Sequence, residues 1–179
     1  YSSDIAYALH ERGHKVTVIT RSVDYKEYNN QRDGVSVYRI LPTLAKYYNL
    51  PGFRHVYRQY DAYAWSVFTK LKEIHEKDHI DIIETPNLHG EAIFWQLFGP
   101  RVPVVVRMHS SSTQNRQLNN KPLNFAAKLD YWQEKLALRK ANAISAVSKS
   151  VIKYNKKLVP INIPMQVIGN PLAQADMVQ

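Results

Sequence analysis

The sequence lacks cysteine and long apolar runs, and each absence excludes a class of protein. Without cysteine the chain has no disulfide scaffold, no zinc finger and no thiol nucleophile, which fits a reducing compartment. No stretch of about 18 apolar residues occurs, so we expect no transmembrane helix. The first residues also lack the apolar core of a signal peptide. We therefore expect a cytoplasmic protein, with peripheral attachment to the inner face of the membrane left open.

The composition is that of one globular domain with an excess of positive charge. The chain has 179 residues, of which 45% are apolar and 22% are charged. Lys and Arg number 24 against 15 Asp and Glu, which gives a net charge of +9. Such a charge suits nucleic acids, anionic membranes or phosphorylated ligands. The basic residues are dispersed and form no recognised nucleic-acid-binding motif, so we expect no nucleic-acid partner and keep that function only as the less favoured alternative.

Strand and helix patterns alternate along the chain, which predicts an α/β fold. Apolar or β-branched runs predict strands, and apolar residues at helical spacing predict the helices between them. The predicted strands are residues 15–20, 35–41, 80–84, 103–109, 143–147 and 165–168. The later predicted helices are residues 53–74, 91–98, 124–139 and 149–158, and the apolar residues of the third are 125, 129, 132 and 136. The predicted loops include residues 21–34, which end in the turn Asp33-Gly34, and residues 110–121. We expect a doubly wound, mostly parallel Rossmann-like sheet with helices on both faces.

Functional residues are expected where the strands end, because ligands of a doubly wound sheet bind beyond the carboxyl ends of its strands. The chain begins inside a predicted helix, without the opening strand and glycine-rich turn that such a domain usually has. The missing first strand would lie at the centre of the sheet. We therefore expect a gap, a shifted pairing, or a strand supplied by another segment between residues 16–20 and 80–84.

Four stretches of sequence, in order and at plausible spacings, resemble a known family. They are AYALHERGHKVTVIT (6–20), DIIETPN (81–87), PVVVRMHSS (103–111) and the pair ANAISAVSKSV (141–151) with MQVIGNPLA (165–173). Together they resemble the N-terminal, acceptor-side domain of a retaining glycosyltransferase of family four, which has the GT-B fold. The resemblance covers nearly the whole chain. It implies a Rossmann-like domain over residues 1–169, truncated at its start, and a linker over 170–179 toward a donor-binding domain that this sequence lacks.

The resemblance also implies an activity, partners and cofactors. The full protein would transfer a sugar from a nucleotide-sugar donor to a hydroxyl acceptor with retention at the anomeric carbon, and the acceptor could be linked to a lipid or a glycan. The second domain would bind most of the donor, so this chain alone would be inactive. No metal ion or other cofactor is expected. A non-catalytic scaffold or regulatory domain of the same fold is the alternative.

The resemblance assigns roles to residues at the strand ends. His109 is the histidine that the family places against the donor sugar, where an imidazole can donate a hydrogen bond to a hydroxyl. Glu84 could accept hydrogen bonds from sugar hydroxyls, act as a base if desolvated, or cap a backbone amide. Asn87 and His89 follow the same strand and are further candidates for binding the acceptor or the sugar.

Two serine positions have a structural alternative to ligand binding. Ser110 begins the stretch Ser110–Thr113, whose hydroxyls could bind a sugar or a phosphate, although such stretches are usually ordinary loops. Ser148 stands where the family repeats a serine. Its favoured role is the N-cap of the predicted helix 149–158, and a helix N-terminus also attracts anions.

One motif and one helix suggest other partners. Residues 75–79 read H-E-K-D-H, the string of zinc proteases, but the predicted helix ends inside it and no third ligand follows, so we expect no metal site. The predicted helix 53–74 has four basic residues beside tyrosine and tryptophan. It could lie on an anionic membrane surface. A core-facing helix with a solvated basic face is the favoured interpretation.

Overall fold

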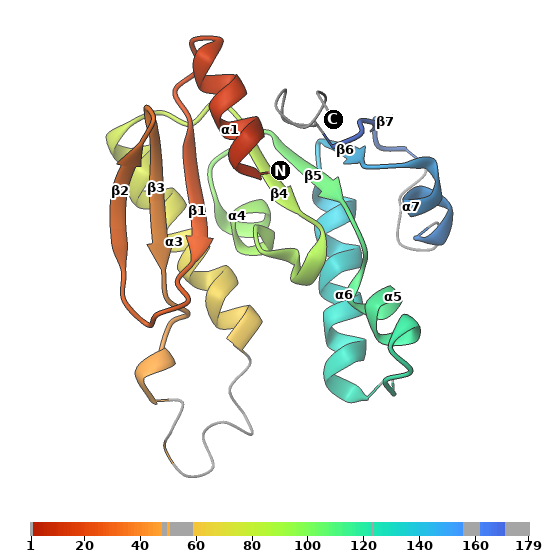
Figure 1. Ribbon diagram of the computed structural model, residues 1–179. Helices are drawn as coiled ribbons and strands as arrows, with labels where there is room; N and C mark the ends of the chain where they lie inside the picture. The colour runs from red at the N-terminus through yellow and green to blue at the C-terminus, as the bar shows by residue number, and fades with distance from the viewer. Residues whose placement is uncertain (1, 48–49, 51–58, 123, 156–161, 171–179) are drawn as a thin grey trace, which may run out of the picture.

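The described part of the chain is an alternating series of helices and strands (Figure 1). In the computed structural model it comprises residues 2–47, 50, 59–122, 124–155 and 162–170. The elements are α1 Ser2–Glu11, β1 Thr17–Arg21, β2 Tyr28–Arg32, β3 Val35–Ile40, the 3₁₀ turn η1 Ala45–Tyr47, α3 Gln59–Lys77, β4 Ile83–Pro86, the 3₁₀ turn η2 Leu88–Gly90, α4 Ile93–Phe98, β5 Val104–Met108, α5 Ser112–Leu118, α6 Phe125–Lys140, β6 Ala143–Ala146, α7 Lys149–Tyr154 and β7 Met165–Val167.

The strands form two sheets. One sheet has the order β1-β3-β2 and the other has the order β4-β5-β6-β7. All pairings between described strands are parallel except that of β2 with β3. Strands β1 and β4 each end a sheet and do not pair with each other, so the gap expected between residues 16–20 and 80–84 is present. The α/β, mostly parallel Rossmann-like fold is confirmed, whereas the expectation of one sheet is wrong.

Strand β2 is an element that the hydrophobic pattern does not reveal. The prediction of a loop over residues 21–34 is wrong there, because β2 pairs antiparallel with β3. All of its residues are exposed, and the sequence YNNQR has no apolar alternation to mark a strand. The predicted turn between the two strands is confirmed. Asp33 (φ 48°) and Gly34 (φ 80°) both have the left-handed backbone of a two-residue hairpin.

Helix α5 occupies residues for which the sequence predicts a loop. The prediction over 110–121 is wrong because the polar sequence STQNRQL forms a short helix capped by Ser111, whose Oγ accepts a hydrogen bond from the backbone N–H of Gln114 at 3.1 Å. The beginning of the predicted helix 53–74 and the end of the predicted helix 149–158 lie outside the described residues. None of the described helices is long and apolar enough to cross a membrane.

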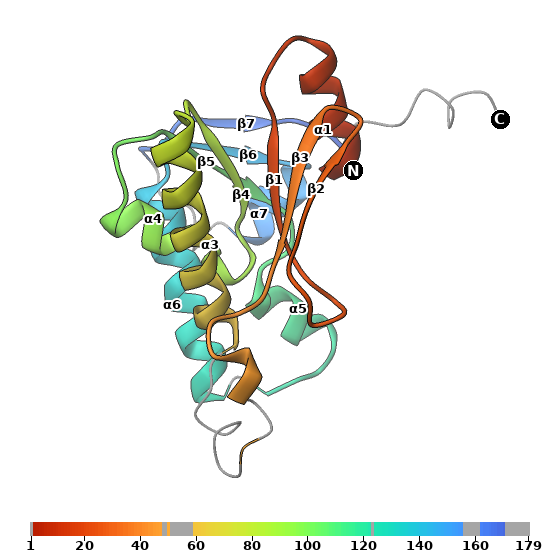
Figure 2. The same cartoon turned by 90° about the vertical axis from the view of Figure 1, so that its left-hand side faces the viewer.

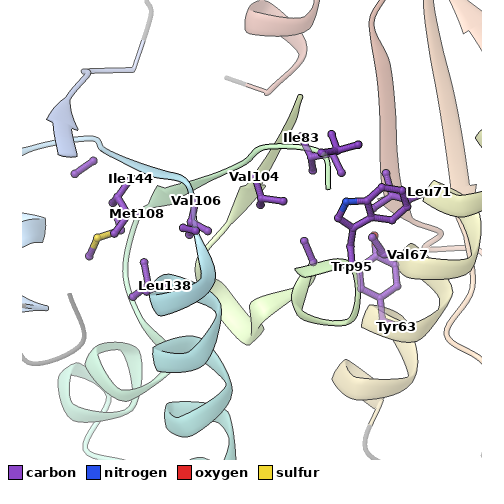
Figure 3. Close-up of a cluster of buried hydrophobic side chains, with 14 of the residues drawn as sticks. Tyr63, Val67, Leu71, Ile83, Trp95, Val104, Val106, Met108, Leu138 and Ile144 are labelled. Atoms are coloured by element: carbon purple, nitrogen blue, oxygen red, sulfur yellow. The ribbon is translucent and has the colours of Figure 1, made fainter. Parts of the chain in front are cut away.

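The main core lies between the sheet β4–β7 and the helices packed on one of its faces (Figure 3). Trp95 of α4, Val106 and Met108 of β5, and Leu138 of α6 are each at most 1% exposed. Complete burial of an apolar side chain of this kind contributes about 1.5–3 kcal/mol. Figure 2 shows α3 and α6 on one side of the strands and α1 on the other. The core therefore fixes β5, and with it the residues that follow this strand.

Candidate functional site

The loops after β4 and β5 are joined by the buried side chain of Asn87, the first residue after β4. Its Oδ1 accepts a hydrogen bond from the backbone N–H of His109 at 2.9 Å, and its Nδ2 donates to the carbonyl of Ser110 at 3.5 Å. Its backbone N–H donates to the carbonyl of Arg107 at 3.0 Å. Because the residue is 0% exposed and both atoms of its amide are bonded, Asn87 holds the two loops together and does not face solvent.

A carboxylate from α6, which the sequence analysis does not single out, fixes the next residues of both loops. Glu134 is fully buried. Its Oε1 accepts hydrogen bonds from the backbone N–H groups of His89 at 3.1 Å and of Ser112 at 3.0 Å. Burial raises the pKa of this carboxyl, and the hydrogen bonds oppose the rise. An acidic residue on the core-facing side of a predicted helix would indicate a buried carboxylate. The larger apolar residues of α6 do not mark its core-facing side, so the sequence does not give this signal for Glu134.

The imidazole of His109 lies half-buried just past the end of β5. Burial lowers the pKa of His109, and the positive charge of Arg107 lowers it further. Arg107 is itself buried, and its Nη2 donates to the carbonyls of Ile168 and Gly169 at 3.0 Å and 3.3 Å. At neutral pH the imidazole of His109 is therefore mostly uncharged, so that one ring nitrogen can donate a hydrogen bond and the other can accept one.

The turn η2 holds His89 in a conformation that its neighbours fix. The φ of His89 is 57°, and its ring stacks on Tyr60 with centroids 3.6 Å apart and 10° between the planes. The carbonyl of His89 accepts a hydrogen bond from Nε2 of Gln133 at 2.7 Å. The next residue, Gly90, also has a φ of 57°, and a Cβ there would lie 3.1 Å from Cγ of Gln133. The packing of η2 on α6 and the left-handed backbone therefore favour a glycine at this position.

The structure does not bring Glu84 to the level of His109. Glu84 pairs in register with Val105, four residues before His109, and four residues of parallel strand span about 13 Å. The side chain is exposed and lies on the face of β4 opposite to Ile83 and Thr85, which are buried. Partial removal of water from its carboxyl raises the pKa of Glu84. Any ligand contact made by Glu84 is therefore well away from the backbone position of His109.

A second acid that the sequence analysis does not single out is Glu91, which directly follows η2. Burial raises the pKa of its carboxyl to about 7. Burial also raises the pKa of Tyr63 on α3, the charge of Glu91 raises it further, and the charge of Arg21 at the end of β1 opposes the rise. Three side chains from distant parts of the sequence thus share one environment. It contains a carboxyl that exchanges its proton near neutral pH.

The serine positions have the structural roles that the sequence leaves open. Ser148 is the N-cap of α7, and its Oγ accepts a hydrogen bond from the backbone N–H of Val151 at 3.3 Å, which confirms the capping interpretation. The stretch after His109 is not an ordinary loop, because Ser111 caps α5 as described above. Ser110 lies half-buried next to His109 in sequence, with its carbonyl bonded to Asn87.

The residues of the H-E-K-D-H string make ordinary structural contacts. Helix α3 ends at Lys77, inside the string. Nδ1 of His75 accepts a hydrogen bond from the backbone N–H of Ile80 at 3.1 Å, and its ring packs edge-on against Trp95 with centroids 5.7 Å apart. Among the residues that the structure describes, no three His, Cys, Asp or Glu side chains lie close enough together to hold a metal ion.

Solved structures of sucrose-phosphate synthase from Thermosynechococcus elongatus share the fold of this chain. One has a TM-score of 0.66 at 15% sequence identity, and the match covers 99% of this chain and 87% of that one. Another has a TM-score of 0.71 at 17% identity and covers 96% of this chain but 42% of that one. At these identities the likeness shows the fold alone. The strand order and these neighbours define the class of fold as a mostly parallel, Rossmann-like α/β domain.

The sequence places the chain in a family within that class. Residues 1–173 match the family model for Glycosyltransferase Family 4. The chain belongs to that family, which confirms the resemblance based on the four ordered motifs. No curated protein sequence matches it. The chain spans less than half the length of the second structural neighbour, 42% of it.

Proposed function

We propose that this chain is the acceptor-side domain of a retaining glycosyltransferase. The complete protein transfers a sugar from a nucleotide-sugar donor to a hydroxyl acceptor linked to a lipid or a glycan. The family membership supports the reaction class. The donor is bound mainly by a second domain, and the reaction uses no metal ion or other cofactor. Residues 1–169 form the acceptor-side domain and residues 170–179 lead toward the second one.

The observation that supports this function best is the state and position of His109. The imidazole stands at the carboxyl end of β5, where a doubly wound sheet binds its ligands. Its lowered pKa keeps it neutral at physiological pH. A neutral imidazole donates a hydrogen bond to a sugar hydroxyl and stays unconsumed while charge develops on the departing phosphate.

The neighbouring candidates have different roles in this proposal. Asn87 positions His109 through the bond to its backbone N–H and does not contact the substrate. His89 and Ser110 lie on the two loops that Asn87 and Glu134 hold, and they contact the acceptor or the transferred sugar. Glu84 binds a more distant part of the acceptor, because its strand register separates it from His109.

The test is the substitution His109→Ala in the complete protein. We expect turnover to fall about 100-fold to 1,000-fold, as for the loss of one hydrogen bond made in a transition state, with the fold unchanged. The anomeric configuration of the product, read by NMR, reports retention. Asn87→Ala is the comparison variant, since it should lower both turnover and thermal stability. Unchanged turnover in His109→Ala, or an inverted product, would contradict the proposal.

A further inference from the structure

Helix α6 exposes three large apolar side chains on the outside of the domain. Phe125 is 76% exposed, Trp132 is 60% exposed and Leu136 is 37% exposed. Their spacing of seven and then four residues places them in one stripe along the helix. Figure 2 shows α6 along an outer side of the molecule. The residues turned inward are Ala127, Asp130, Glu134, Ala137 and Leu138. An ordinary surface helix has its apolar stripe only on the side that faces the core, whereas α6 has this further apolar stripe on its outward side.

The stripe is bordered by positive charge. Lys128, Arg139 and Lys140 are exposed, and Nζ of Lys135 lies 5.1 Å from the ring centroid of Trp132. The two acids of the helix, Asp130 and Glu134, are both buried. The outward face of α6 therefore consists of aromatic and aliphatic groups flanked by basic groups, without an acidic residue of α6 to balance them. This face is called the α6 stripe below.

The chemistry of the α6 stripe selects one occupant. A helix that lies in a membrane interface has an apolar centre with Trp, Phe or Leu and a flank rich in Lys and Arg, which attracts anionic headgroups. A second copy of the chain fits less well, because symmetric docking would bring the basic flanks of the two helices against each other. Charge complementarity therefore favours an anionic lipid surface.

Helix α3 also has several basic residues, but it differs from α6 in how acidic residues balance them. Lys72 lies 3.8 Å from Glu76, and Lys70 and Lys77 both pair with Glu73. The described lysines of α3 are thus balanced by acids on the same helix. Trp65 of α3 is 42% exposed and packs against Phe68 and Phe94, so the balance of charge is what distinguishes the two helices.

We propose that the α6 stripe docks this domain on an anionic lipid surface, with Trp132 and Phe125 in the headgroup region and the basic flank against lipid phosphates. The inward side of the same helix holds η2 and the start of α5 through Glu134. Docking through α6 therefore places these loops one helix diameter, about 10 Å, from the lipid surface. The proposal is independent of the reaction, since its test measures binding and not turnover.

The first test is co-sedimentation with vesicles of phosphatidylcholine alone, or of phosphatidylcholine and phosphatidylglycerol in equal amounts. We expect binding only to the anionic vesicles. The double variant Lys128→Glu with Arg139→Glu should bind at least about 30-fold more weakly, because each basic group near such a surface contributes about fivefold. Lys26→Glu with Lys153→Glu is the matched control. It lowers the net charge of +9 by the same four units from exposed positions outside α6, and it should lose less than about threefold.

The second test uses tryptophan fluorescence, because insertion into the headgroup region shifts the emission of an exposed indole to shorter wavelength. We expect anionic vesicles to produce this shift in the protein and in Trp65→Phe, and not in Trp132→Phe. Equal loss of vesicle binding in the two charge-reversal variants would overturn the proposal, as would equal binding to both kinds of vesicle. Self-association that Trp132→Ala abolishes, without any vesicle binding, would instead assign the α6 stripe to a second copy.

Discussion

Two carboxyl groups near the strand ends, the buried Glu134 and the half-buried Glu91, have different consequences because their surroundings differ. Glu134 accepts hydrogen bonds from two backbone N–H groups of separate loops, so its charge is compensated where it is buried. For Glu91, burial is the cause that raises the pKa of its carboxyl, to about 7. We therefore expect Glu134 to act as a fixed structural anchor and Glu91 to change its charge within the physiological range.

The titration of Glu91 predicts a pH dependence of stability. The pKa rises from its ordinary value of 4.5 to about 7 on folding, so folding takes up a proton between these pH values. Stability from this group is therefore highest at low pH and is lost as the pH rises from about 4.5 to about 7, with a slope of at most about 1.4 kcal/mol per unit. Glu91→Gln should flatten this part of the curve and make the protein more stable at pH 8 than the parent.

Urea unfolding at pH 5 and at pH 8 measures the effect. Glu76→Gln is the control, since it makes the same substitution at an exposed position of α3. If the difference in free energy of unfolding between the two pH values is the same in Glu91→Gln as in the parent, then Glu91 is not the group that titrates.

At the scale of elements, the short helix α7 depends on its first hydrogen bond. Ser148 caps α7 through the backbone N–H of Val151. Ser148→Ala should therefore lower the free energy of unfolding by about 1 kcal/mol. Ser150→Ala, an exposed site on the same helix, should leave it within about 0.5 kcal/mol. Denaturant unfolding compares the two variants. A loss of turnover in Ser148→Ala without any loss of stability would mean that the hydroxyl binds a ligand and that capping is secondary.

The elements also show what the sequence can and cannot predict. Strand β5 is predictable because Val104, Val105 and Val106 form an apolar β-branched run in the core sheet. Strand β2 is not, because its pairing with β3 needs no buried side chain. The apolar spacing at residues 125, 129, 132 and 136 predicts the helix α6 correctly. Its largest members lie on the outward side, so the spacing does not reveal that Glu134 is buried.

At the scale of the whole molecule, the alternating order of elements predicts which edge of the sheet carries the candidate site. It predicts the individual residues of that site less well. Asn87 and His109 are found together because both follow parallel neighbouring strands, as the topology predicts. The register that separates Glu84 from His109 is not visible in the sequence, since each strand alone is compatible with several registers. Glu91 and Arg21 share an environment because both lie near Tyr63 of α3. This proximity depends on how α3 packs against loops of both sheets, and no local sequence pattern encodes it.

The last prediction concerns donor binding by this domain alone. In our proposal the base, ribose and diphosphate of the donor are held mainly by a second domain, and this chain supplies the loops around Asn87, His89 and His109. Such a half-site has no closed cleft to exclude water and strengthen its polar contacts. Binding of nucleotide sugars to this chain should therefore be millimolar or weaker, which corresponds to about 4 kcal/mol or less. Calorimetry with uridine and guanosine diphosphate sugars measures this affinity. Micromolar binding would show that this domain holds the donor, and the proposed division between acceptor and donor sides would then be wrong.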